Sequence, residues 1–420
     1  MERSDARNST GSMHLDRRRA LVAGLGGVVG AQALLSSAAF GRSRSTDPGG
    51  NLVVLQLSGG NDGLSTVVPY SDDAYHAARP TIARKGDEVL PLDARIGLHS
   101  ALLRLRSRYD QGQVAIVEGI GYERPNRSHF KSLEVWHAGD RAGRGVSEGW
   151  LGRLAAAIAP EPDPLRVVHV GKRVPFAVHS QGHPAVSFQV PDVYRWLEHG
   201  EVLAADVPRA EPEGNETPAR REVLELLRRK SRDAGASSRA VREAVAGHTP
   251  KAKYPDTALG RSLRIAASLI HADLGTRILS LEMGGYDHHN KLRERHDRLM
   301  AQLDEALEAF QLDLETSDPG RRTATLVFSE FGRRVAENGS QGTDHGKAGI
   351  AFVLGHHVHG GLHGAPPSLT ALSKGDLAHT TDFRSVYDGL SHGLFGVRPA
   401  PVGAGGRTRP ESLAVVDLTI

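Results

Sequence analysis

Carboxylates and histidines recur in this sequence next to short apolar runs that predict buried strands. Asp287, His288 and His289 follow a glycine pair after one such run, and Asp344 and His345 stand between glycines shortly before another. Imidazole nitrogens and carboxylate oxygens together are typical ligands of zinc and similar divalent ions. The two clusters therefore predict a metal site built from nitrogen and oxygen.

Two more strand exits carry carboxylates. Asp62 lies among glycines after the apolar run 52–57, and Glu330 follows the run 323–328. A carboxylate at a strand exit suits a hard or borderline cation. An aspartate between glycines is also a common turn residue, so for Asp62 both interpretations stay open.

Ser128 and His129 follow the apolar run 114–119 and lead into a predicted helix. At a helix N-terminus, backbone N–H groups and the helix dipole favour an anion or a nucleophilic oxygen, which makes Ser128 a candidate nucleophile. The alternative is that Asn126 or Ser128 simply caps the helix.

The elements that must position these residues alternate between strand and helix. Apolar runs without period-two alternation predict strands buried on both faces, as in parallel sheets. Helices are predicted over 291–314 and after Pro255-Asp256-Thr257, where apolar residues recur at steps of three and four. This pattern predicts an α/β three-layer sandwich with a mostly parallel central sheet, whose strands are 52–57, 114–119, 166–170, 277–283, 323–328 and 350–354. In such sheets ligands bind at the carboxyl ends of strands.

The composition excludes several classes of protein. The 420 residues include no cysteine, which rules out a disulfide scaffold, a thiolate metal site and a cysteine nucleophile. Hydrophobic content of 39% with 24% charged residues predicts a globular protein. The formal net charge is only +3, so charge alone does not indicate nucleic-acid binding, and none is expected.

The N-terminus resembles a secretory signal. Arg17, Arg18 and Arg19 precede an uncharged, glycine- and alanine-rich run over 22–39, which is typical of a twin-arginine signal peptide. A membrane anchor is the alternative, but the glycines make a poor membrane-spanning helix. We expect residues 1–40 to be the signal, and 41–420 to form a single periplasmic or secreted domain without a stable membrane span.

Residues 200–255 interrupt the alternating pattern. A Pro- and Glu-rich stretch is followed by an arginine-rich helical one. It predicts a helical insertion that caps the sheet; a solvated loop is the alternative.

Five motifs in order resemble one family of exported proteins, domain of unknown function 1501. They are 52–63 (LVVLQLSGGNDG), 127–130 (RSHF), 284–287 (GGYD), 329–333 (SEFGR) and 342–346 (GTDHG). That family is related to the alkaline phosphatase and sulfatase superfamily of metal-dependent hydrolases. The resemblance therefore implies an alkaline-phosphatase-like fold and bound divalent metal ions, such as Zn²⁺, Mn²⁺, Mg²⁺ or Ca²⁺.

The resemblance also implies roles for individual residues. In one register Asp344-His345 matches the superfamily's Asp-His pair. In the other, which we prefer, Ser329-Glu330-Phe331-Gly332 matches the Ser-Asp-His-Gly segment that contains this pair, and His345 matches the late histidine before the next strand. The preferred register makes Asp287, His289 and His345 a three-ligand site. Asp62, Glu330 and Asp344 then offer oxygen to a second cation.

Ser128 would attack phosphorus or sulfur, and His129 would act as an acid or a further ligand. Phe331 departs from the pattern, because it stands where the hydrolases have a ligand histidine and it cannot bind metal. This departure leaves open a non-catalytic alternative, in which the protein binds a partner protein, such as a second exported protein, or a surface polymer instead of a small ester.

Overall fold

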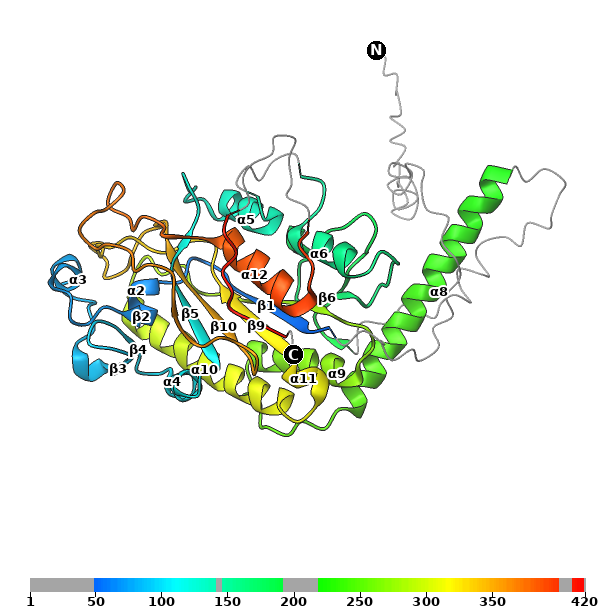
Figure 1. Ribbon diagram of the computed structural model, residues 1–420, viewed down its shortest axis with the longest axis horizontal. Coiled ribbons are helices and arrows are strands. Elements are labelled where there is room, and N and C mark those ends of the chain that lie inside the picture. Colours follow the sequence, from blue (N-terminus) through cyan, green and yellow to red (C-terminus); the bar gives the residue numbers. More distant parts are fainter. Residues whose placement is uncertain (1–48, 141–145, 192–217, 400–409, 419–420) are drawn as a thin grey trace, which may run out of the picture. The chain divides into compact units, whose positions relative to one another are not determined.

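The computed structural model describes residues 49–140, 146–191, 218–399 and 410–418 (Figure 1). The predicted signal peptide lies outside the described residues, as does the first part of the predicted insertion, and no part of either prediction is tested there. Among the described residues, no helix has both the length and the hydrophobicity needed to cross a membrane.

Nine strands of the described chain form one central sheet. Across the sheet they run in the order β11 (Gly361–His363), β5 (Val114–Gly121), β10 (Gly349–Leu354), β9 (Thr323–Phe328), β1 (Asn51–Leu57), β8 (Ile278–Met283), β6 (Val167–Val170) and β7 (Val186–Phe188), with β12 (Thr381–Asp382) also paired to β5. All six predicted strands are present with boundaries within two residues of those expected.

Strand direction decides which chain segments meet at one edge. Strand β1 pairs in parallel with β8 and β9, and β6 pairs in parallel with β7 and β8. Strand β10 is antiparallel to both of its neighbours, β5 and β9. The start of β10 therefore lies at the same edge as the carboxyl ends of β1, β5, β8 and β9. The predicted mostly parallel sheet is confirmed.

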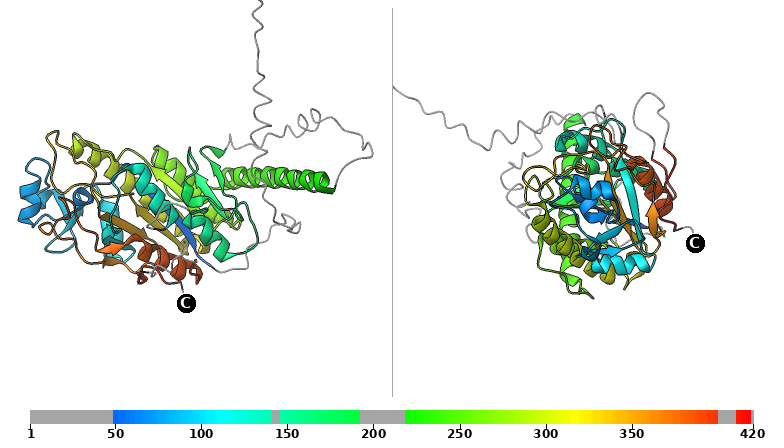
Figure 2. Two further views of the ribbon diagram at one scale, coloured as in Figure 1. Left: turned by 90° about the horizontal axis from the view of Figure 1, so that it is seen from above. Right: turned by 90° about the vertical axis from the view of Figure 1, so that its left-hand side faces the viewer.

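Apolar side chains fill both faces of the sheet. Along β1, Val53 and Leu55 join one buried cluster, whereas Leu52 and Val54 join the other. The first cluster includes side chains of α4 (Leu103–Asp110), α9 (Ala258–Ala272) and α10 (Leu292–Leu314). The second includes side chains of α5 (His129–Ala138), α6 (Trp150–Ile158) and α12 (Phe383–Phe395). Helices therefore cover both faces, as Figure 2 shows, and the α/β three-layer class is confirmed.

The two longest predicted helices begin where local sequence stops them from extending further. Helix α9 starts after Thr257, whose side-chain oxygen accepts the backbone N–H of Gly260 at 3.0 Å. Helix α10 starts after Lys291, which has φ 45° and so cannot continue the helix backwards. The buried side of α10 carries Leu292, Leu303 and Phe310, and the last two belong to the first buried cluster.

The described part of the insertion is helical. Helix α8 (Pro218–Gly247) packs against α9, and Val241 near its end is fully buried. The helix agrees with the predicted helical insertion; its described packing partner is a helix of the outer layer.

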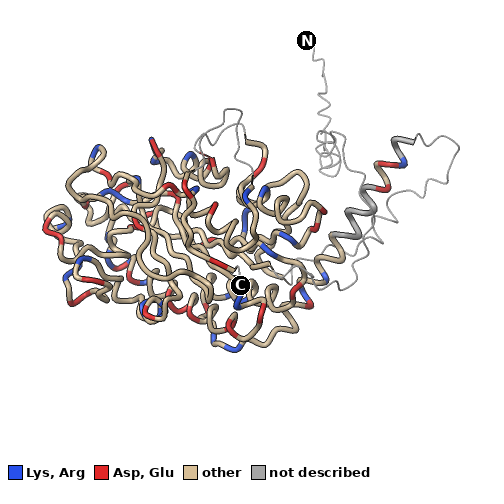
Figure 3. The backbone as a smooth tube through the Cα atoms, viewed as in Figure 1, with Lys and Arg blue, Asp and Glu red and all other residues tan. Residues whose placement is uncertain are grey.

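Smaller elements complete the described chain. A second sheet has the order β2 (Val67–Val68), β4 (Gly97–His99) and β3 (Val89–Pro91). Short helical segments are α2 (Gly63–Thr66), α3 (Asp73–Ala78), α11 (Asp318–Arg321) and the 3₁₀ turns Gly86–Glu88 and Phe176–Val178. Basic and acidic residues are interspersed along the described chain, as Figure 3 shows.

Candidate metal centre

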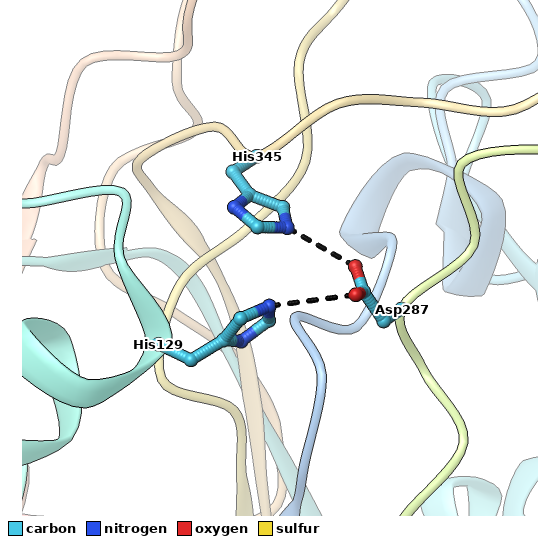
Figure 4. A group of neighbouring side chains, drawn as sticks. All are labelled: His129, Asp287 and His345. Atoms are coloured by element: carbon cyan, nitrogen blue, oxygen red, sulfur yellow. Dashed lines mark hydrogen bonds and ion pairs between the residues drawn. The ribbon is translucent and has the colours of Figure 1, made fainter.

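Three side chains from distant parts of the chain meet at the sheet edge. His129, Asp287 and His345 each place one ligand atom within 4.8 Å of the other two (Figure 4). His129 begins α5 after β5, Asp287 follows β8, and His345 precedes the antiparallel strand β10. The distances are 3.0 Å from His345 Nε2 to Asp287 Oδ1 and 3.6 Å from His129 Nε2 to Asp287 Oδ2.

A fourth side chain, His289, lies against the same group. Its Nε2 is 3.0 Å from Asp287 Oδ1 and 3.0 Å from His345 Nε2. The structure thus brings together all three ligands of the predicted site, Asp287, His289 and His345, and adds His129 to them.

The outer nitrogen of each of these imidazoles faces a hydrogen-bond acceptor. His129 Nδ1 is 2.8 Å from Glu330 Oε1, and His289 Nδ1 is 3.0 Å from Asp344 Oδ1. His345 Nδ1 is 2.8 Å from the backbone carbonyl of Arg127. Carbonyls and ionised carboxylates only accept, so each Nδ1 is the donor of its pair. In the neutral form of each ring, Nε2 then presents a lone pair to a metal ion.

In that form the Nε2 lone pairs face the carboxylate of Asp287, which is the arrangement of ligand atoms around a bound cation. Nitrogen and oxygen ligands about 2.0–2.1 Å from a zinc ion form a tetrahedron whose corners lie about 3.3 Å apart. The separations of 3.0–3.6 Å given above match that spacing. Three imidazoles and one carboxylate suit Zn²⁺ or a similar transition-metal ion, so the residues fit the predicted metal.

A buried arginine holds the group in place. The guanidinium of Arg333 donates to Asp287 Oδ1 at 2.6 Å, and its side chain is 1% exposed. It also donates to the backbone carbonyls of Gly60 at 2.8 Å, Thr343 at 2.9 Å and Tyr286 at 3.1 Å, and to that of Gly59. Arg333 thereby ties the β1, β8 and β10 loops to one another.

The same arginine keeps Asp287 ionised. Burial opposes the charge of this carboxylate, but the hydrogen bond and the positive charge of Arg333 outweigh burial and hold its pKa well below the usual range. Arg333 lies within the motif 329–333, but no role was predicted for it from the sequence. Its position three residues after Glu330, at the end of a strand, was the feature that could have indicated one.

Glu330 and Asp344 support the histidines from behind. Glu330 is 1% exposed, and its Oε1 accepts both the backbone N–H of Gly59 at 2.9 Å and the proton of His129 Nδ1. Burial opposes its ionisation, but these hydrogen bonds lower its pKa overall. Asp344 pairs with His289 in the same way. Both carboxylates therefore contact the Nδ1 side of a histidine and not the space between the Nε2 atoms and Asp287.

Asp62 is engaged elsewhere. Its carboxylate caps α2 by accepting the N–H of Ser65 at 2.9 Å, and it pairs with the buried guanidinium of Arg79 at 2.8 Å. Its second oxygen accepts the Thr343 hydroxyl at 2.9 Å. The three carboxylates predicted for a second cation, Asp62, Glu330 and Asp344, therefore face different partners in the described contacts and are not brought together.

Ser128 lies exposed at the N-cap position of α5, directly before His129. Its side chain makes no capping hydrogen bond to the helix, and its backbone N–H donates to Asn126 Oδ1 at 2.9 Å. The hydroxyl is therefore not used as the helix cap.

Phe331 packs directly against His129 and His345. Its ring centroid is 4.9 Å from that of His129 and 4.9 Å from that of His345, and the residue is 3% exposed. The ring restricts the rotation of both imidazoles. His296 of α10 is fully buried, and its Nε2 lies 3.1 Å from Thr66 Oγ1.

Two glycines allow the loops to approach this closely. Gly59 has φ +117°, and a Cβ there would lie 2.5 Å from the backbone nitrogen of Asp287. Gly60 has φ +77°, and its Cβ would lie 2.3 Å from Phe331 Cε2. Larger residues at either position would push the β1 loop away from the group.

The chain is remotely similar to several solved structures, sulfatases among them. Ps i-CgsB has 11% identity and a TM-score of 0.36, with 83% of this chain and 72% of that chain covered. The PsFucS1 sulfatase from Pseudoalteromonas sp. has 11% identity and a TM-score of 0.36, with 83% and 68% covered. BT1596, a 2-O GAG sulfatase, has 11% identity and a TM-score of 0.32, with 74% and 65% covered. A likeness at this level says nothing about activity.

No curated protein matches the sequence. A family model does: residues 117–388, more than half of the chain, match the protein family of unknown function DUF1501. The matched range contains His129, Asp287, His289, Glu330 and His345. The chain therefore belongs to the DUF1501 family, as its motifs predicted.

Proposed function

We propose that this protein is a metal-dependent hydrolase of phosphate or sulfate esters, with its ion bound by His129, Asp287 and His345. The observation that carries the proposal is the convergence of the Nε2 atoms of His129 and His345 on the carboxylate of Asp287, with each Nδ1 facing a hydrogen-bond acceptor. Asp287 is about half exposed, so the group is open to a ligand from solvent.

The bound ion supplies a Lewis acid that withdraws charge from the oxygens of the ester. Ser128 Oγ attacks phosphorus or sulfur and releases its proton to solvent, while the bond to the leaving oxygen breaks and the alcohol takes up a proton. Water then cleaves the resulting serine ester. The position of Ser128 supports this role, because it is exposed and adjacent to the ligand His129.

His289 favours a second candidate function. Its Nε2 lies 3.0 Å from both Asp287 Oδ1 and His345 Nε2, so it offers a further protein ligand beside these two, outside the group of His129, Asp287 and His345. A closed set of four is typical of structural zinc sites, whereas catalytic sites keep one position open. The alternative is a non-catalytic protein of the same fold, in which the ion holds a binding surface for a protein partner or a polymer.

The test uses the full-length chain. Metal content is measured on the purified protein, and turnover is measured with aryl phosphate and aryl sulfate esters in the presence of Zn²⁺, Mn²⁺ or Ca²⁺. We expect one equivalent of metal to be lost in Asp287→Ala and His345→Ala but retained in His356→Ala, whose histidine is exposed and outside the group. Ser128→Ala should keep this metal and lose turnover.

The outcomes separate the two functions. Metal that is bound without turnover of any ester would leave only the binding role. If the purified protein holds no stoichiometric metal and the Asp287 and His345 variants behave like the unaltered chain, the metal centre is refuted for both candidate functions.

Export is part of the proposal. The arginine-led segment within residues 1–40 supports passage to the periplasm or the exterior by a twin-arginine-type route. Replacing Arg17, Arg18 and Arg19 by lysine should retain the protein inside the cell, and the N-terminus of exported protein should begin near residue 40. Unchanged export would contradict this route.

A further inference from the structure

A second cluster of metal-ligand side chains lies on the helical layer, away from the sheet edge. His248, His271 and Asp313 each place one ligand atom within 4.8 Å of the other two. His248 follows the end of α8, His271 lies in the last turn of α9, and Asp313 lies in the last turn of α10. The cluster therefore joins the ends of three helices.

The cluster is buried. The side chain of Asp313 is fully buried, and those of His248 and His271 are 10% and 15% exposed. Asp313 Oδ2 is 2.9 Å from His248 Nε2 and accepts the Tyr254 hydroxyl at 3.0 Å, and Oδ1 accepts the backbone N–H of Lys251 at 3.0 Å. The two imidazole rings are stacked, with centroids 4.8 Å apart and planes 17° apart.

His271 Nε2 is the unexplained atom. It is buried, it has no hydrogen-bond partner, and it lies 3.7 Å from Asp313 Oδ1. That separation is too long for a hydrogen bond if the nitrogen carries a proton. If it carries a lone pair instead, the lone pair faces a buried carboxylate without compensation. A cation between the two atoms satisfies both.

We propose that His248, His271 and Asp313 bind a divalent transition-metal ion of the zinc class, which fastens the end of α8 to α9 and α10. Separations of 2.9 Å and 3.7 Å between ligand atoms bracket the spacing of about 3.3 Å expected around zinc. A carboxylate has about four acceptor positions. Lys251 and Tyr254 donate to two of those on Asp313, so positions remain for the ion, to which His248 Nε2 also binds.

This site is independent of the centre at the sheet edge. His289 lies just before the start of α10, whereas Asp313 lies in its last turn. An α-helix rises about 1.5 Å per residue, so the two ends of α10, a helix of 23 residues, are roughly 35 Å apart. Substitutions at one site therefore leave the ligands of the other in place.

Metal stoichiometry tests the proposal. The full chain is stripped with a chelator, dialysed against Zn²⁺, and its bound metal is measured. We expect two equivalents in the unaltered chain, one in His271→Gln, one in His345→Ala, and none in the double variant. Glutamine keeps a neutral polar side chain at position 271 but removes the imidazole ligand, and His356→Gln is the matched control with two equivalents.

Two results would overturn the inference. One is a single equivalent in the unaltered chain that disappears in His345→Ala but not in His271→Gln; the other is two equivalents that His271→Gln leaves intact. His248→Gln, at the edge of the cluster, repeats the measurement if His271→Gln does not fold. Ester turnover, if present, should be the same in His271→Gln and the control, so that failure here and failure of the hydrolase proposal are told apart.

Discussion

The ion pair between Asp62 and Arg79 offers a test of whether Asp62 supports the fold or binds metal. Both side chains are almost completely buried, at 1% and 0% exposed. In Asp62→Asn the remaining oxygen can still accept from Ser65 and Arg79, and the Thr343 hydroxyl can reverse and accept from the new amide. The substitution therefore removes the charge while it can keep every hydrogen bond.

The expected loss of stability is large. Removing one member of a buried ion pair costs about 3–5 kcal/mol, because the other charge stays buried without a counter-ion. Unfolding entropy of about 2.1 cal/mol/K per residue, over roughly 330 residues, converts this loss to a decrease of about 4–7 °C in Tm. The control is Asp72→Asn at the N-cap of α3, where the half-exposed Asp72 accepts the N–H of Ala74 at 2.8 Å. Asparagine caps about as well as aspartate, so little change is expected there.

The assay is thermal and urea-induced unfolding of both variants, with and without metal, together with the metal content. We expect Asp62→Asn to lose stability and to keep its full metal content. A variant with unaltered stability and reduced metal content would refute this reasoning and make Asp62 a ligand.

The stability that the ionised carboxylate of Asp62 contributes should decrease at low pH. Burial opposes the charge of Asp62, but the guanidinium of Arg79 outweighs burial and lowers the pKa of this carboxyl below its usual range. Stability from the ionised carboxylate is therefore fully present above about pH 4 and is lost as the pH falls through the folded-state pKa. The difference between the unaltered chain and Asp62→Asn should be constant near neutral pH and shrink below pH 4; a difference that grows on acidification would contradict it.

Three further predictions concern the sheet edge. Glu330→Gln removes the carboxylate behind His129 and should weaken metal binding about 10–100-fold in equilibrium dialysis, with unchanged affinity counting against a supporting role. Gly60→Ala should destabilise the protein by more than about 1 kcal/mol through its positive φ and the clash with Phe331, whereas Gly339→Ala, where a Cβ meets nothing within 4 Å, should be neutral in the same unfolding assay. Chelation should lower the free energy of unfolding by about 2.7 kcal/mol relative to protein with metal at 100 times its Kd, and an unfolding curve indifferent to chelator would speak against a bound ion.

Much of the fold could be predicted because the strands are buried on both faces. The run at Thr323–Phe328 is apolar or β-branched throughout, and the observed strand has the predicted boundaries. The direction of β10 could not be predicted, because an apolar run does not distinguish a parallel strand from an antiparallel one. The antiparallel direction depends on the loops before and after it.

Part of the candidate site could also be predicted from the buried strands, because several of its residues directly follow them. Asp287 and His289 follow a strand, and parallel strands end at one edge, so their proximity to other strand-end residues was expected. Asp62 had the same signature and took another partner, because Arg79, 17 residues later, reaches it only in the folded chain. The cluster at His248 had no sequence signal at all, since its ligands come from three separate helices.

The position of His345 before β10 also bears on how the centre is assembled. His129 and Glu330 are 201 positions apart in the chain, and Arg127 and His345 are 218 apart. Contacts of such long range form late, after the loop entropy between them has been overcome. The centre cannot nucleate folding, and during synthesis it stays incomplete until His345, on the approach to β10, has left the ribosome. The proposed ion therefore meets its complete set of ligands only after β1, β5, β8 and β9 have been synthesised.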